Sequence, residues 1–207
     1  MYNNGVTETG DSVFYLGASM VLSTSITDEV VILRPFRLED ANQLHQAVCE
    51  SLTELKPWMS WAHDAYSQQE ATDFIRITRV RWEERTLFAF AITSADTGEI
   101  LGGCSLSHKH PVYHYCNLGY WVRSSNHGKG TAGRAAKLAA RYGFEHGGII
   151  RAEVVIAMGN QKSIRVAEKI GAHYEGILLN RMVVGKSFFD AHMYSIIPQD
   201  FGLPAHL

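Results

Sequence analysis

The chain reads Asn-Leu-Gly-Tyr-Trp-Val-Arg-Ser-Ser-Asn-His-Gly-Lys-Gly-Thr-Ala from Asn117 to Ala132. A strand-like alternation of apolar residues comes first, a polar turn follows, and an alanine-rich helical pattern begins near Thr131. Gly128 and Gly130 let the backbone approach a ligand closely, and the start of the helix offers unpaired N–H groups and the positive end of its dipole. This stretch therefore predicts a binding site for a ligand that carries phosphate.

Two other interpretations of these glycines stay open. The spacing Gly128-x-Gly130-x-x-Gly133 also fits the dinucleotide-binding fingerprint. That fingerprint places its first glycine directly after a strand of a parallel unit, whereas the polar residues from Ser124 to His127 intervene here. The other interpretation is a glycine turn that only caps the helix. A P-loop does not fit, because Arg123 occupies the position of its first glycine.

Outward from this stretch, hydrophobic periodicity and turn residues divide the chain into strands and helices. Strands are predicted at 30–33, 87–93, 99–107, 115–123, 149–157, 172–184 and 188–197. Helices are predicted at 38–55, at 131–146 and at 161–169. Another helix is predicted to begin after a capping box formed by Ser67 and Glu70. The order predicts an α/β (α+β) fold, in which a mixed, mostly antiparallel twisted sheet of about seven strands is flanked by about four helices.

Composition limits the classes of function. A chain of 207 residues with a net charge of -2 fits one domain and lacks the concentrated basic surface that binding to nucleic acid or a membrane surface needs. Three cysteines without a C-x-x-C pair indicate reduced thiols in a cytoplasmic protein, and no apolar run is long enough for a membrane span. We expect a loose leader over residues 1–25, a single domain over residues 26–207, and no metal site.

Two motifs resemble those of a known family. The loop from His127 to Ala132 resembles the Q/R-x-x-G-x-G/A acyl-CoA signature of the GCN5-related N-acetyltransferases (GNAT), with histidine at its first position. The run Asn160-Gln161-Lys162-Ser163, continued to Gly176, resembles a motif of the RimJ/RimL branch, which acetylates protein N-termini. Shorter matches lie at 33–36, 57–58, 119–121 and 194. The resemblance spans roughly residues 30–197 and implies the GNAT fold and an acetyl-CoA-dependent N-acetyltransferase.

The resemblance also implies where acetyl-CoA would bind. Backbone N–H groups of the loop would bind its pyrophosphate, and the strand that ends near Trp121 would separate from the next strand and bind the pantetheine arm and thioester. Asn160 would orient the pantetheine or the substrate. The cofactor-binding residues so implied are Trp121, Val122, Arg123, His127, Gly128, Lys129, Gly130, Thr131, Ala132 and Asn160.

The sequence offers few candidates for the catalytic acid and base. Ser163 and Asn160 are the catalytic candidates, with Ser163 near the sulfur as a proton donor, although the first turn of any helix accepts a serine readily. The chain has Ala167 where related enzymes place a tyrosine acid, and Asn117 where the branch commonly has an acidic residue. Histidines at 108, 110 and 114 are candidate bases. An α-amine, with a pKa of about 8 against about 10.4 for lysine, needs less help from a base.

The acceptor site is expected near Trp58, Trp61, Tyr120 and Asn117, although the paired tryptophans also fit core or lid packing. The resemblance implies direct attack of an amine on the thioester. The first expectation for that amine is the N-terminus of a protein, with ribosomal proteins as the family precedent. The alternatives are a small amine, such as an antibiotic or aminoacyl compound, and a non-catalytic module that binds acyl-CoA or a nucleotide. A homodimer is an assembly that the resemblance allows.

Overall fold

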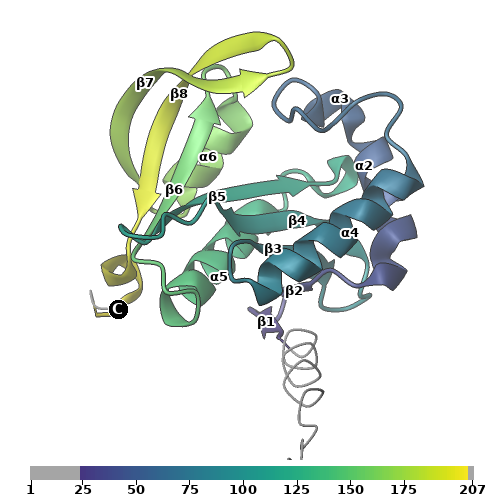
Figure 1. Cartoon of the computed structure of the whole chain (residues 1–207), viewed down its shortest axis with the longest axis horizontal. Helices are drawn as coiled ribbons and strands as arrows, with labels where there is room; N and C mark the ends of the chain where they lie inside the picture. The colour runs from purple at the N-terminus through teal and green to yellow at the C-terminus, as the bar shows by residue number, and fades with distance from the viewer. Residues whose placement is uncertain (1–23, 205–207) are drawn as a thin grey trace, which may run out of the picture.

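A computed structural model describes residues 24–204 and shows one open sheet with helices on both faces (Figure 1). The strands are β1 (Ile26–Thr27), β2 (Val31–Pro35), β3 (Phe88–Ser94), β4 (Ile100–Ser107), β5 (Tyr115–Val122), β6 (Arg151–Ala157), β7 (His173–Val184) and β8 (Ser187–Ile196). Their order in the sheet is β1-β2-β3-β4-β5-β6-β8-β7. The predicted fold class is confirmed. Nearly all of the predicted leader, residues 1–25, lies outside the described residues.

The helices also follow the predicted order. They are η1 (Leu38–Asp40), α2 (Ala41–Glu50), α3 (Leu52–Leu55), α4 (Gln68–Glu83), η2 (Ser124–Asn126), α5 (Thr131–Glu145), α6 (Gln161–Lys169) and η3 (Pro198–Phe201). The capping box before α4 is present: Ser67 accepts from the Glu70 N–H, and the Glu70 carboxylate accepts from the Ser67 N–H. Between residues 24 and 204, no helix combines the length and hydrophobicity that a membrane span requires.

The single helix predicted at 38–55 is wrong. The structure divides it into η1, α2 and α3, with a break at the buried Ser51. The Ser51 hydroxyl donates to the Ala47 carbonyl at 2.7 Å and accepts from the backbone N–H of Ser124 at 3.0 Å. A side chain bonded to its own helix competes with the helical ladder, and here a distant loop holds it in place. Apolar spacing cannot reveal such a break, because the partner is far away in sequence.

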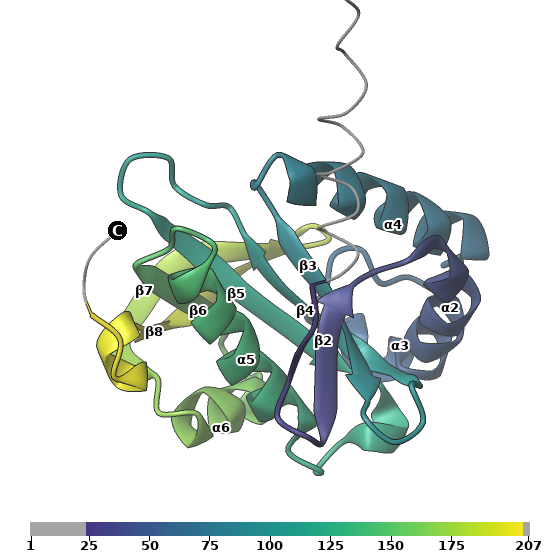
Figure 2. The same cartoon turned by 90° about the horizontal axis from the view of Figure 1, so that it is seen from below.

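Two hydrophobic clusters fix the helices on the sheet. Figure 2 shows α5 and α6 on one face and α2, α3 and α4 on the other. Alternate side chains of β3 serve both faces: Phe88, Phe90 and Ile92 join the α5 cluster, and Ala89 and Ala91 join the α2 and α4 cluster. The face of α5 toward the sheet is built of small, buried residues, so this helix lies close to the strands. Its first turn is thereby held at the end of β5.

The sheet opens between β5 and β6. These two strands are parallel, and they pair only from Tyr115 to Asn117 of β5 with Arg151 to Glu153 of β6. Beyond Asn117, β5 pairs only with β4, up to Val122. The edge of β5 that faces β6 therefore has backbone groups without a strand partner along the last residues of the strand. The separation that the family resemblance implied is present.

Candidate functional site

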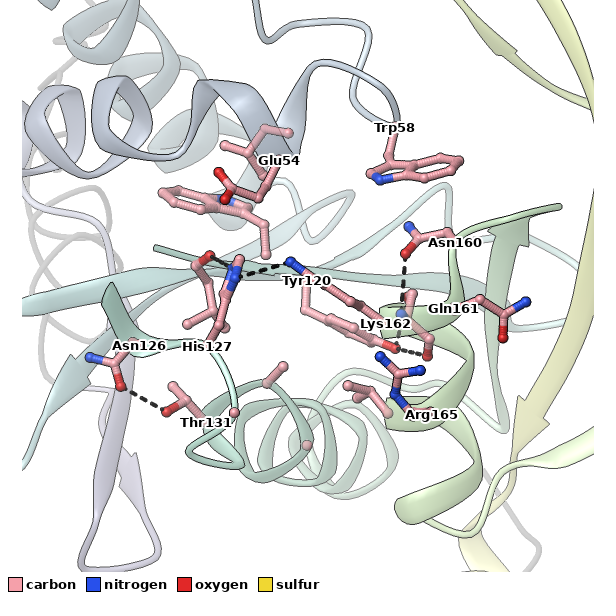
Figure 3. A pocket seen from close by; sticks show the side chains of 18 of the residues that line it. Glu54, Trp58, Tyr120, Asn126, His127, Thr131, Asn160, Gln161, Lys162 and Arg165 are labelled. Carbon is pink, nitrogen blue, oxygen red and sulfur yellow. Dashed lines mark hydrogen bonds between the residues drawn. The ribbon is translucent and has the colours of Figure 1, made fainter. Parts of the chain in front are cut away.

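A cavity of about 920 Å³ lies where β5 and β6 separate (Figure 3). Its walls come from α3 and the following loop, the end of β5, the glycine loop with the first turn of α5, and the first two turns of α6. The candidate residues from the sequence that line it are Trp58, Tyr120, Trp121, Val122, His127, Gly128, Gly130, Thr131, Ala132, Asn160 and Ser163. Four segments distant in sequence thus meet at one site.

The glycine loop presents its backbone to this cavity. Gly128 and Gly130 have φ angles of 79° and 80°, which L side chains rarely adopt. A Cβ added at either residue would meet nothing within 4 Å, so the space in front of the loop is open. Gly130 is the N-cap of α5, and no side chain caps that helix. Its first N–H groups and the positive end of its dipole are therefore available to an anion.

His127 joins the loop to both sides of the cavity. Its Nε2 lies 3.0 Å from the Val122 carbonyl oxygen, and its Nδ1 lies 3.4 Å from Nζ of Lys162 on α6. A carbonyl can only accept, so Nε2 carries the proton and Nδ1 accepts from the lysine. Lys162 thereby reaches from α6 to the loop, as Figure 3 shows. The histidine at the first motif position holds the end of β5 and the start of the loop together.

Tyr120 and Ser163 form a hydroxyl pair on the floor of the cavity. The Ser163 hydroxyl donates to Oη of Tyr120 at 3.2 Å, and the Tyr120 hydroxyl lies 3.3 Å from the Ser163 carbonyl oxygen, to which it can donate. Burial raises the pKa of Tyr120 to about 12, so this hydroxyl keeps its proton at neutral pH. The pair can therefore deliver a proton to an anion that forms nearby.

Asn160 holds the start of α6. It is the N-cap of this helix, and its Oδ1 accepts from the backbone N–H of Ser163 at 3.2 Å. The amide nitrogen is thus the end of Asn160 that can donate to a ligand.

Trp58 closes the cavity from the other side: a Cβ added at Gly159 would lie 3.7 Å from Cη2 of the Trp58 indole. The loop after α3 and the turn before α6 therefore meet across the site.

The remaining candidates from the sequence lie outside this cavity. Trp61 packs on Trp121 with ring centroids 6.0 Å apart and is 40% exposed. Asn117 lies in the paired part of β5, opposite Glu153. The Arg123 guanidinium is bound by Glu50, with Nε 2.9 Å from Oε2, and by Glu99. Lys129 lines a neighbouring pocket of about 520 Å³ together with the basic residues Arg134, Lys137 and Lys169.

Other reactive side chains are also remote from the cavity. The three candidate histidines lie in the loop at the opposite end of β5, where His110 stacks on Tyr113 and Tyr115. All three cysteines are free thiols, and burial raises the pKa of Cys116 to about 12. None of these side chains lines the cavity. Among the described residues, no group of three or more His, Cys, Asp or Glu side chains could hold a metal ion.

Sequence reasoning missed the charged residues of the cavity. Lys162, Arg165 and Lys169 line it from α6, and Glu54 lines it from α3. The spacing of Lys162, Arg165 and Lys169 on a predicted helix could have identified one basic face. No signal could have identified Glu54, because its position depends on the break at Ser51.

An ionic cluster fastens the cavity's outer wall. Glu50 at the end of α2 accepts from the Arg123 guanidinium and from the backbone N–H of Ser125 at 2.8 Å. The hydrogen bond from Arg123 lowers the pKa of Glu50 to about 2. A carboxyl with a lowered pKa stabilises the folded state fully above its ordinary pKa, and this contribution is lost as the pH falls toward the lowered value. The window here extends from about pH 4.5 down to about pH 2.

Glu50→Gln should therefore weaken the dependence of stability on pH. We expect the urea midpoint to fall relative to the wild type at about pH 7, and this deficit to shrink at about pH 3, where Glu50 of the unfolded chain is mostly protonated and part of its stabilisation is lost. The matched control is Glu83→Gln, an exposed residue of α4, which should change neither midpoint. A deficit that is equal at both pH values would contradict the assignment.

Comparisons with known proteins agree with this geometry. The family model described as Acetyltransferase (GNAT) domain matches residues 31–173. Ribosomal-protein-serine acetyltransferase of Escherichia coli (strain K12) is 22% identical over 154 residues, covering 74% of this chain and 85% of that protein. Spermidine N(1)-acetyltransferase of the same organism is 26% identical over 161 residues, covering 78% and 82%. The solved structure of RimL, a ribosomal L7/L12 alpha-N-protein acetyltransferase in complex with Coenzyme A, has a TM-score of 0.77 at 21% identity, covering 84% and 98%.

Proposed function

The chain belongs to the GNAT acetyltransferase family, and we propose that it transfers the acetyl group of acetyl-CoA to the α-amine of a protein N-terminus. The observation that carries this proposal is the glycine loop, which opens onto a cavity at the point where β5 and β6 separate. The loop suits a pyrophosphate, and the unpaired edge of β5 suits an amide-containing chain such as pantetheine. The relatives named for acetylating ribosomal proteins support the choice of acceptor.

Coenzyme A also carries a third phosphate, and a second site suits it. The pocket beside the loop is lined by Lys129, Lys137 and Lys169, with Arg134 paired to Asp28 at 2.7 Å. Three lysines and one carboxylate-bound arginine leave this pocket with excess positive charge. The adenosine end of the cofactor would lie here, while its thioester reaches along β5 toward Tyr120 and Ser163.

The cavity's own groups then account for the reaction. The neutral amine attacks the thioester carbon, and N–H groups on the unpaired edge of β5 stabilise the oxyanion. The nitrogen loses a proton to solvent, the carbon–sulfur bond breaks, and the thiolate takes a proton from the hydroxyl pair of Ser163 and Tyr120, which regains one from solvent. Asn160 donates to the substrate or the pantetheine and keeps α6 in place. No covalent intermediate with the enzyme is needed.

The test has a binding arm and a turnover arm. We expect acetyl-CoA and CoA to bind in a calorimetric titration and NADH to give no signal. We also expect CoA release that requires both acetyl-CoA and a short peptide with a free N-terminal serine or alanine. Binding without turnover, with peptides and with spermidine alike, would identify a non-catalytic module, and turnover with spermidine alone would replace the protein acceptor with a small amine. Binding of NADH would overturn the proposal.

A further inference from the structure

The charged side chains that line the cavity come from two elements (Figure 3). The basic side chains come from α6 and comprise Lys162, Arg165 and Lys169. The carboxylate comes from α3 and is that of Glu54, the one acidic side chain among the residues that line the cavity. An anionic donor suits the basic side. A cationic group suits the side of Glu54, which lies above His127 and Tyr120 in Figure 3.

Glu54 is held in place by one of its two oxygens. Its Oε2 accepts from the Ser124 hydroxyl at 2.7 Å, and the Ser124 N–H is bound in turn to Ser51. Within residues 24–204, no side chain of another residue donates to Oε1, and Lys162 bonds to His127 rather than to Glu54. One carboxylate oxygen therefore remains for a ligand.

The surroundings keep Glu54 ionised. The hydrogen bond from Ser124 lowers the pKa of Glu54, and the nearby His127 and Lys162 act in the same direction. The half-buried side chains of Trp58 and Met59 line the same wall of the cavity. A cavity lined by one carboxylate and by indole and thioether groups suits an amine whose carbon skeleton is apolar or small.

We propose that Glu54 binds the acceptor's amine and receives the proton that its nitrogen loses during transfer. This inference rests on the proposed function and extends it to the group that recognises the acceptor. The nitrogen lone pair forms the bond to the thioester carbon, and the nitrogen becomes cationic and strongly acidic. Its proton passes to the Glu54 carboxylate, directly or through water. The sulfur leaves with a proton from the hydroxyl pair, Glu54 then returns its proton to solvent, and the hydroxyl pair regains one from solvent.

The experiment compares the binding of two peptides, one with an N-terminal amine and one without it. The probes are a short peptide with a free N-terminal serine and the same peptide with 3-hydroxypropionyl in place of serine, which lacks only the amine. Both are titrated into the protein saturated with CoA. We expect the wild type to bind the amine peptide more tightly by about tenfold or more, and Glu54→Gln to abolish this preference. In turnover, Glu54→Gln should lower kcat/KM for the amine peptide by about 100-fold. Acetyl-CoA affinity should be unchanged.

Two controls keep the outcomes distinct. Glu83→Gln, the same change on the exposed face of α4, should leave both the preference and the turnover unchanged. Glu54→Asp keeps the charge and should restore part of the preference, which a purely structural role would not require. A preference in Glu54→Gln equal to that of the wild type, with normal turnover, would overturn this inference alone. No turnover by the wild type with any peptide would overturn the proposed function itself.

Discussion

Gly130→Glu is expected to lower the affinity for acetyl-CoA by about 100-fold or more while the protein remains folded. Gly130 is the N-cap of α5 with a φ of 80°, and an added Cβ would project into open space in front of the loop. The new carboxylate would lie at the helix N-terminus, where it would compete with the cofactor's phosphates and repel them. The backbone strain itself costs only about 1–2 kcal/mol. Calorimetric titration with acetyl-CoA measures the loss.

Gly185→Glu is the matched control. Gly185 also has a positive φ, 60°, and also faces open space, but it lies in the turn between β7 and β8. Gly185→Glu introduces the same charge with a similar backbone strain, and its affinity for acetyl-CoA should equal that of the wild type. If Gly130→Glu bound acetyl-CoA as tightly as Gly185→Glu does, the loop would not be the phosphate site.

Gly102→Ala is expected to lower the free energy of unfolding by about 3 kcal/mol. A Cβ at Gly102 would lie 2.2 Å from the Trp121 carbonyl oxygen and 2.9 Å from Cα of Val122. Both atoms belong to the backbone of β5, which pairs with β4 at this position. No side-chain rotation can relieve the contact, so the strands must separate. Urea unfolding monitored by circular dichroism measures the change.

The neighbouring residue provides the comparison. A Cβ at Gly103 would lie 2.7 Å from Nε1 of Trp121, which belongs to a side chain and can move. We therefore expect Gly103→Ala to cost clearly less stability than Gly102→Ala, and to disturb the cavity wall by displacing the indole of Trp121. Equal losses in the two variants would mean that the backbone contact at Gly102 is not the limiting one.

The helices show which features can be predicted from the sequence and which cannot. Local signals succeeded: the capping box at Ser67 begins α4, and α6 runs from Gln161 to Lys169 as predicted. Both depend on residues within one turn of each other. The break at Ser51 was missed because its partner, Ser124, belongs to a distant loop. The position of Glu54 was missed for the same reason.

The tryptophans show a second limit. Trp58 and Trp61 are both predicted at the acceptor site because they are close in sequence, yet only Trp58 lines the cavity. Trp61 packs against Trp121 instead. The loop after α3 has no periodicity from which the direction of each ring could be inferred. Spacing identified the segment that borders the site but not the side chain that enters it.

The separation of β5 and β6 bears on how such an enzyme could change its specificity. In the proposed function, the donor is held largely by main-chain groups, those of the glycine loop and the free edge of β5. The acceptor faces side chains of α3 and the loop that follows it, which contribute little to the sheet. Exchange of this one segment could therefore redirect the enzyme to a different amine, and the same acetyl donor would still serve. A scaffold divided in this way can diversify by mutation on one side without losing its chemistry on the other.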